Sequence, residues 1–260
     1  MGSCTICHSD MHFAFKQKLL RKHEVTYFYC AECGFLQSED PYWLDEAYSS
    51  AIAIQDTGLV QRKISRKLSV ILYLLFDRNG RYLDFAGGYG MLTRMMRDIG
   101  FDFFWVDKYA ENILASGFSA NENAGPFNAV TAFEVLEHVH EPLEFVAEAL
   151  ECGDSRTLIF STETFSGEPP APGGWWYYAP ETGQHISFYQ KRTLARIASH
   201  HGLQFYSKAG MHIFTDKRLS HPAVALLGQP TFVAFVNFLV SKMMHSKTQA
   251  DHLFLKNRLQ

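Results

Sequence analysis

The sequence of 260 residues lacks a long apolar run, a secretory signal and an excess of charge of one sign. Its most apolar segment, Pro222–Val240, is interrupted by Gln229-Pro230 and by Asn237, whereas a membrane span needs about 20 predominantly apolar residues. The first residues show no basic stretch followed by an apolar core, so no secretory signal is indicated. We expect no membrane span, and we expect residues 222–240 to form helices that pack on the domain or form a dimer face.

The charges are nearly balanced, with 24 basic and 27 acidic residues and a formal net charge of −3. Such a chain has no large positive field that would attract nucleic acid or an anionic membrane. Acidic residues also outnumber basic ones in the first 48 positions, so we expect no nucleic-acid partner. Apolar residues make up 47% and charged residues 20%, which excludes disorder as the main state. The 15% of aromatic residues suggests an aromatic-lined cavity.

Cysteine is scarce, but four of the five cysteines form two Cys-x-x-Cys pairs, Cys4/Cys7 and Cys30/Cys33. An odd, paired set argues against a disulfide framework and for a metal site in a reducing cytoplasm. Two such knuckles can place four thiolates around one Zn²⁺, which would stabilise a module too small for its own core. The alternative is a set of redox-active or incidental cysteines. We expect the lone Cys152 to be a small buried residue.

The chain divides by pattern into a zinc-binding module (1–40), linker helices (41–79), a central domain (80–215) and a helical extension (216–260). In the central domain strand-like and helix-like segments alternate, which predicts an α/β fold: a Rossmann-like, mostly parallel sheet with helices on both faces. The helical extension is expected to break near Gly228–Pro230, and Asp251-His252 to lie in a solvated tail. The predicted strands are Arg81–Phe85, Phe103–Val106, Ala129–Phe133, Thr157–Ser161 and Gln204–Lys208; the predicted helices are Met91–Ile99, Leu143–Leu150 and Lys191–His201.

A glycine-rich turn, Ala86-Gly87-Gly88-Tyr89-Gly90, joins the first of these strands to a helix. Glycines there let a ligand approach the backbone, and the helix N-terminus offers N–H groups to an anionic group. Asp107, at the end of the next strand, is placed to bind the hydroxyls of a ribose. A dinucleotide fingerprint needs a further glycine where Thr93 stands, which disfavours a nicotinamide oxidoreductase. S-adenosylmethionine fits this pattern, and a plain tight turn is the alternative.

The segment Leu83–Gly90 resembles the D-x-G-x-G-x-G motif of class I S-adenosylmethionine-dependent methyltransferases, with Ala86 at the first glycine position. Residues 127–139, which end in Leu-Glu-His-Val, resemble the fourth strand and following helix start of that family. The resemblance covers about Gly80 to Gly210. It implies that the methionine moiety is held by Asp84, Ala86, Gly88 and Gly90, the ribose by Asp107 and the adenine by Phe118, unless Phe118 is a core residue. It also implies that Phe133 and Glu134 face the sulfonium. We expect Glu137 and His138 to be helix-start and packing residues, and a catalytic role is the alternative.

The irregular segment Phe165–Gly183 leads to His185, which we consider as a general base because methylation of oxygen or carbon needs the acceptor's proton removed. A histidine bonded to backbone is the alternative. A cysteine-pair module before such a domain is similar to the sugar C-methyltransferases, whose corresponding segment reads H-E-H-F-S-Y. Here Gln184 stands where that segment has its glutamate, beside the histidine that matches His185. This difference leaves open that the acceptor atom is oxygen. The sequence as a whole resembles the methyltransferases called type 23.

The sequence therefore predicts an S-adenosylmethionine-dependent methyltransferase that acts on a small molecule, with a sugar or nucleotide sugar as a candidate. His185 and Glu134 are the predicted catalytic residues, and a structural Zn²⁺ is the second cofactor. A homodimer remains open. The alternative is a zinc-ribbon RNA-binding protein or an RNA methyltransferase.

Overall fold

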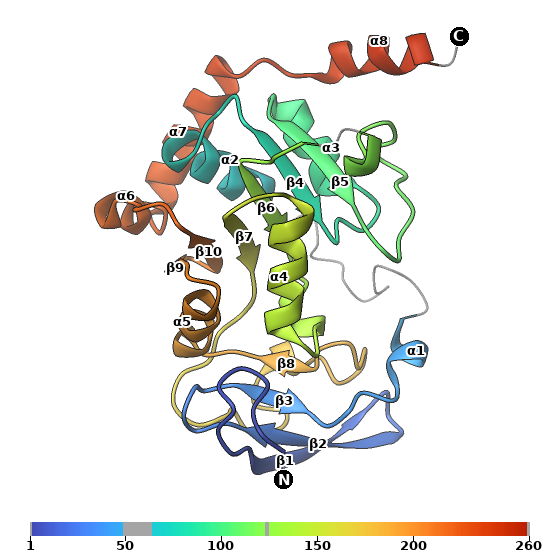
Figure 1. Ribbon diagram of the computed structural model, residues 1–260, viewed down its shortest axis with the longest axis vertical. Helices are drawn as coiled ribbons and strands as arrows, with labels where there is room; N and C mark the ends of the chain where they lie inside the picture. The colour runs from blue at the N-terminus through green and yellow to red at the C-terminus, as the bar shows by residue number, and fades with distance from the viewer. Residues whose placement is uncertain (1, 49–63, 123–124, 259–260) are drawn as a thin grey trace. The chain divides into compact units, whose positions relative to one another are not determined.

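Figure 1 shows the computed structural model, which describes residues 2–48, 64–122 and 125–258. Contacts between residues divide the chain into two compact units, each built from three separate segments. We call them the cysteine unit (Met1–Ala53, Phe133–Glu148 and Phe160–Asp216) and the glycine-turn unit (Ile54–Ala132, Ala149–Ile159 and Lys217–Gln260). The sequence-based boundaries after residues 40, 79 and 215 stay predictions, and part of the predicted linker lies outside the described residues.

The glycine-turn unit contains three parallel strands, β4 (Arg81–Phe85), β5 (Asp102–Val106) and β6 (Ala129–Ala132). Leu83 lies opposite Phe104 in β5 and Val130 in β6. The inner residues of these strands are buried at consecutive positions, as is typical of strands that are covered on both faces. Helix α3 (Met91–Ile99) follows β4 and ends at Gly100, and α2 (Ile64–Leu75) precedes β4.

The larger sheet has the strand order β5-β4-β6-β7-β10-β9, with β7 at Thr157–Ser161. Strands β9 (Gln204–Lys208) and β10 (Met211–Thr215) are an antiparallel pair at one edge. Between the strands of the larger sheet, the chain forms helices α4 (Pro142–Cys152) and α5 (Lys191–His200). It also forms short 3₁₀ turns at Ala120–Glu122 (η1) and Leu136–His138 (η2). The predicted fold class, α/β with a mostly parallel sheet, is confirmed.

The cysteine unit contains a second sheet with the order β1-β2-β3-β8. Strands β1 (His12–Leu19) and β2 (His23–Tyr29) form an antiparallel hairpin, and β3 (Leu36–Ser38) joins β2 to β8 (Ser187–Phe188). Helix α1 (Leu44–Ala47) and the 3₁₀ turn η3 (Trp176–Tyr178) also belong to this unit. Large aromatic side chains fill the core beneath the sheet: Tyr27, Trp43, Tyr177, Tyr178 and Phe188.

The carboxyl-terminal helices are α6 (His221–Leu226), α7 (Pro230–Met243) and α8 (Thr248–Arg258), with the break before Pro230 as predicted. Within the described part of the chain no helix is long and apolar enough to cross a membrane. Two expectations are wrong. Asp251 does not lie in a solvated tail, because it is buried in α8 and pairs with Arg97 at 2.7 Å. Cys152 is exposed rather than buried, because it lies at the last turn of α4.

Candidate functional site

The glycine-rich turn runs from the end of β4 to the start of α3 and uses three left-handed residues: Ala86 (φ 55°), Gly88 (φ 54°) and Gly90 (φ 82°). A Cβ atom at Gly90 would lie 2.7 Å from Asn112 Oδ1, so only glycine fits there without displacement. A Cβ at Gly87 would lie 2.7 Å from the Trp105 ring. A Cβ atom at Gly88 would have no atom of the other described residues within 4 Å, its chain neighbours apart, so the backbone of Gly88 faces open space that a ligand can enter.

Asp107 lies directly beside this turn. Its Oδ2 accepts a hydrogen bond from the Gly88 N–H at 2.8 Å, and its Oδ1 accepts from the N–H groups of Tyr109 (2.7 Å) and Ala110 (2.8 Å). The Trp105 Nε1–H donates to the Gly88 carbonyl at 2.9 Å. The structure therefore brings together Gly88 and Asp107, which the sequence placed at the ends of two neighbouring strands.

Asp84 lies under the turn and is almost fully buried. It accepts hydrogen bonds from the Thr131 hydroxyl (2.9 Å) and the Thr93 hydroxyl (3.4 Å). Burial raises the pKa of Asp84 to about 7, and the nearby Asp107 contributes to the same shift. Thr93, which entered the sequence argument only as a missing glycine, is thus a partner of the buried carboxyl group.

Phe118 has a packing role in the structure. The guanidinium carbon of Arg97 lies 3.7 Å from the centre of its ring, and the Phe254 ring lies 5.8 Å away, centre to centre. Such a cation–π contact is stabilising when the cation is desolvated, and Arg97 is buried. Contact of Phe118 with an adenine stays a prediction.

In the cysteine unit, Phe133 and Glu134 follow the end of β6, and both are partly buried. Glu134 has a left-handed backbone (φ 57°), which is uncommon for a residue with a side chain and often marks a functional position. Its Oε1 accepts a hydrogen bond from the Ser161 hydroxyl at 2.6 Å, and its backbone N–H donates to Ser161 Oγ at 3.0 Å. Ser161 is the last residue of β7, so these two hydrogen bonds hold the predicted catalytic glutamate at the end of that strand.

His185 lies beside two residues that the sequence assigned to packing, Glu137 and His138. One nitrogen of each ring and one carboxyl oxygen, the atoms that could bind a metal ion, all lie within 4.8 Å of one another. The centres of the two imidazole rings are 4.8 Å apart, nearly perpendicular at 84°. Burial lowers the pKa of His138 to about 3, with a smaller effect from His185. Burial also raises the pKa of Glu137 to about 8, with help from Glu134. The Leu-Glu-His-Val motif could be recognised in the sequence, but nothing in the sequence indicated that its Glu137 and His138 lie close to His185.

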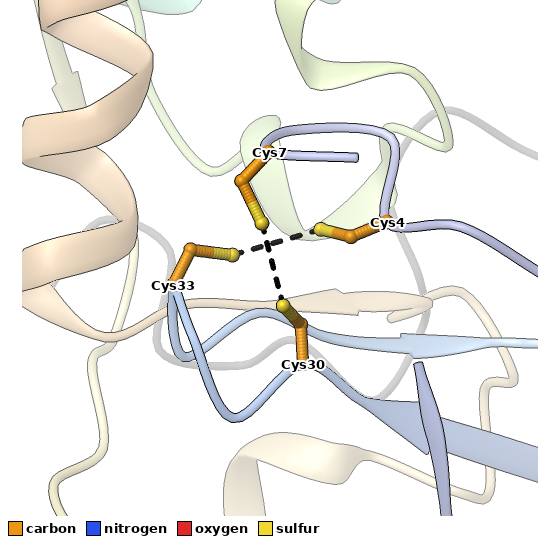
Figure 2. Close-up of side chains that lie close together, drawn as sticks. All are labelled: Cys4, Cys7, Cys30 and Cys33. Carbon is orange, nitrogen blue, oxygen red and sulfur yellow. Dashed lines mark hydrogen bonds between the residues drawn. The ribbon is translucent and has the colours of Figure 1, made fainter. Parts of the chain in front are cut away.

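The four paired cysteines lie together in the cysteine unit (Figure 2). Cys4 Sγ lies 3.6 Å from Cys33 Sγ, and Cys7 Sγ lies 3.4 Å from Cys30 Sγ, with the two lines crossing. A tetrahedral zinc site with Zn–S bonds of about 2.3 Å has sulfur atoms about 3.8 Å apart, so the arrangement fits a Cys₄ site. The knuckle at Cys30 is closed by the Gly34 N–H, which donates to the Cys30 carbonyl at 2.8 Å.

Residues 58–208 match the family Methyltransf_23, described as a methyltransferase domain. No curated protein sequence matches the chain at a significant level. Similar solved structures include TnmH (14% identity, TM-score 0.42, 60% of this chain and 55% of that one) and an O-methyltransferase family protein from Burkholderia thailandensis (15%, 0.43, 63% and 57%). Another is magnesium protoporphyrin IX methyltransferase from Synechocystis PCC 6803 with bound SAH (14%, 0.38, 67% and 94%). The chain thus spans little more than half the length of the first two.

The matched segment covers more than half of the chain. It includes the glycine-rich turn, Asp107, Glu134 and His185. The predicted methyltransferase domain is thereby confirmed. The chain belongs to the methyltransferase-domain family Methyltransf_23.

Proposed function

We propose that this protein transfers the methyl group of S-adenosylmethionine to a small-molecule acceptor. The observation that supports this most directly is the open backbone at Gly88 beside the carboxylate of Asp107. In this proposal the turn and Asp84 hold the methionine end of the cofactor, Asp107 holds the ribose, and Phe133 lies near the sulfonium. The acceptor atom forms a bond to the methyl carbon while the C–S bond breaks. The electron pair of the C–S bond stays on sulfur, and S-adenosylhomocysteine forms.

The acceptor class and its chemistry are part of the same proposal. The net charge of −3 does not favour a polyanion, so we place a small, partly polar molecule such as a sugar or nucleotide sugar in the acceptor role. Glu134 and His185 are the candidate groups for handling the acceptor's proton, for oxygen or carbon methylation. The Cys₄ cluster would hold a structural Zn²⁺. A reducing cytoplasm suits these free thiols.

A homodimer stays a proposal. Phe235 and Phe238 are exposed and lie three positions apart, on one face of α7. A second copy of the chain would remove these rings from water, and light scattering of the purified protein measures this directly.

Calorimetry with S-adenosylhomocysteine tests the cofactor site. We expect the wild type to bind, with a dissociation constant below about 1 mM, the upper end of ordinary substrate constants. Asp107→Ala should weaken binding by about 10- to 100-fold, because hydrogen bonds to a charged group contribute about 1.5–3 kcal/mol. Asp107→Asn tests the charge while keeping the size. Glu111→Ala removes an exposed carboxylate from the same loop and should bind like the wild type. No binding by the wild type would end the proposal, and salt-sensitive RNA binding would favour the RNA alternative.

A further inference from the structure

The cluster of Glu137, His138 and His185 is held by hydrogen bonds between two distant segments, to the backbone carbonyls of residues 136, 137 and 139. The Ile186 N–H donates to the Glu137 carbonyl at 2.8 Å. The Ser187 hydroxyl donates to the Val139 carbonyl at 2.6 Å, and the Tyr189 hydroxyl to the Leu136 carbonyl at 2.8 Å. These bonds fasten η2 to the segment around β8. The three side chains are therefore positioned by rigid backbone, which a binding site requires.

Both histidines in the cluster have the same fixed tautomer. His138 Nδ1 lies 3.1 Å from the Gln184 carbonyl oxygen, and His185 Nδ1 lies 2.6 Å from the Tyr177 carbonyl oxygen. A carbonyl oxygen only accepts hydrogen bonds, so each Nδ1 carries the proton and each neutral ring has its lone pair on Nε2. Metal-bound histidines nearly always show this pattern, in which the other ring nitrogen donates to a carbonyl or carboxylate.

Glu137 is the third member, and it is 1% exposed. Tyr177 and Thr162 form hydrogen bonds with its carboxyl group, but the Oε2 atom is buried and has no hydrogen-bond partner among the described residues. A buried carboxylate oxygen without a partner costs free energy, so such groups are normally paired or bound to a metal. A second carboxylate, that of Glu134, lies close enough to act on Glu137 electrostatically. The cluster thus combines two imidazole nitrogens with lone pairs and a buried carboxyl oxygen that has no hydrogen-bond partner among the described residues, with a second carboxyl group nearby.

We propose that Glu137, His138 and His185 form a second metal site that binds a divalent transition-metal ion. Two imidazoles and one carboxylate suit Zn²⁺, Co²⁺, Mn²⁺ or Fe²⁺ better than Mg²⁺ or Ca²⁺, which prefer all-oxygen ligands. Ligand atoms at about 2.1 Å from an ion lie up to about 4.2 Å apart, so small side-chain rotations close the observed spacing of up to 4.8 Å. Three protein ligands leave positions open for an oxygen ligand.

The metal site has a consequence for the acceptor, which rests on the function proposed above. A metal ion held by these three residues would lower the pKa of an acceptor hydroxyl bound at an open position, and the released proton would pass to water. His185 then acts as a metal ligand instead of removing the proton itself. The site therefore selects acceptors with a hydroxyl group and favours methylation of oxygen.

The experiment is a titration of the full-length protein with Co²⁺, with Zn²⁺ retained in the cysteine cluster. We expect one Co²⁺ per chain, with visible ligand-field absorption and no thiolate charge-transfer band. Glu137→Gln, His138→Gln and His185→Gln should each weaken Co²⁺ binding by more than about 10- to 100-fold, the loss typical of removing even an outer partner. His140→Gln is the matched control, because that histidine lies outside the cluster and contacts Glu141 at 3.3 Å.

The outcomes separate this site from the methyltransferase proposal. Unchanged Co²⁺ binding in the three variants, or Co²⁺ bound only through thiolates, overturns the metal site. Circular dichroism and retained Zn²⁺ show that each variant is folded, and calorimetry with S-adenosylhomocysteine reports on the cofactor site separately. If the Glu137→Gln variant methylates a hydroxyl acceptor at the wild-type rate, the metal has no role in the reaction. That result leaves the cofactor site and the enzyme class unchanged.

Discussion

Asp84 makes the stability of the protein depend on pH in an unusual direction. Its folded-state pKa of about 7 lies above the ordinary value of 3.8, because burial disfavours the charged form. Between these two values the folded state keeps a proton that the unfolded state releases, so the free energy of unfolding falls as the pH rises. Each pKa unit corresponds to about 1.4 kcal/mol, which gives a loss of about 4 kcal/mol across the whole window.

Asp84→Asn should remove this dependence, because the amide does not titrate. We expect the difference in unfolding free energy between wild type and variant to change by about 3 kcal/mol between about pH 5 and about pH 8, with the wild type relatively weaker at the higher pH. Urea unfolding at the two pH values measures it, and the titration of all other groups cancels in the difference. A difference independent of pH would show that Asp84 is ionised in the folded protein throughout.

At the level of residues, the sequence could predict the positions of Asp84, Gly88 and Asp107 because the turn and strand ends bring them together in any such sheet. It could not predict the hydroxyl of Thr93 beside Asp84, or the orphaned oxygen of Glu137. The first depends on how α3 packs against β4, nine residues away, and the second on burial by segments far away in the chain. A motif gives residue types and spacing, whereas hydrogen-bond satisfaction is a property of the assembled core.

Helix α8 is attached to its unit by a buried ion pair. Both oxygens of Asp251 are bonded to Arg97, at 2.8 Å and 2.7 Å, and Arg94 adds a bond at 2.9 Å. Burial alone would raise the pKa of Asp251, but the hydrogen bonds and charge of Arg97 outweigh it and lower the pKa. This contribution to stability is therefore present at neutral pH and is lost as the pH falls through the lowered pKa.

Asp251→Asn should lower the free energy of unfolding by about 3–5 kcal/mol, because it leaves the buried Arg97 guanidinium without its counter-charge. Asp98→Asn is the control: Asp98 is half-exposed and pairs with Arg94 across one helical turn, a type of pair that contributes about 0.3–0.5 kcal/mol. Chemical unfolding followed by circular dichroism compares the two. Equal effects of the two substitutions would mean that the Asp251 pair is fully hydrated in solution.

Strong hydrophobic patterning decided which elements were predictable. Strands β4, β7 and β9 and helix α3 have the predicted bounds. Strand β1 was missed because its inner and outer residues do not alternate clearly, and its turn uses Leu20 and Arg21 at positive φ in place of glycine or asparagine. Strand β10 was missed because its buried residues include His212 and Thr215, which carry no apolar signal.

At the scale of the whole molecule, the two units could not be read from the sequence. Each collects three segments that are separate in the sequence, whereas composition changes suggested consecutive blocks. The cysteine unit illustrates the reason. Trp43 donates a hydrogen bond to the Gly183 carbonyl at 2.8 Å, and Gln190 reaches Tyr29 at 3.2 Å. Contacts between residues more than a hundred positions apart therefore define this unit, and local patterns do not encode them.

The Cys₄ cluster should control the folding of the whole cysteine unit. Structural zinc sites contribute about 10–16 kcal/mol of apparent binding free energy to folding in zinc-finger peptides. Cys30→Ser should therefore remove one zinc per chain and abolish the near-ultraviolet circular dichroism of the aromatic core around Tyr27 and Trp43. Cys152→Ser, at the exposed thiol, should change neither. Metal analysis and circular dichroism measure both quantities. A Cys30→Ser protein that keeps its full zinc content and its aromatic signal would show that the four thiols hold no metal, because a Cys₄ shell that loses one thiolate cannot keep both its affinity and its share of the folding free energy.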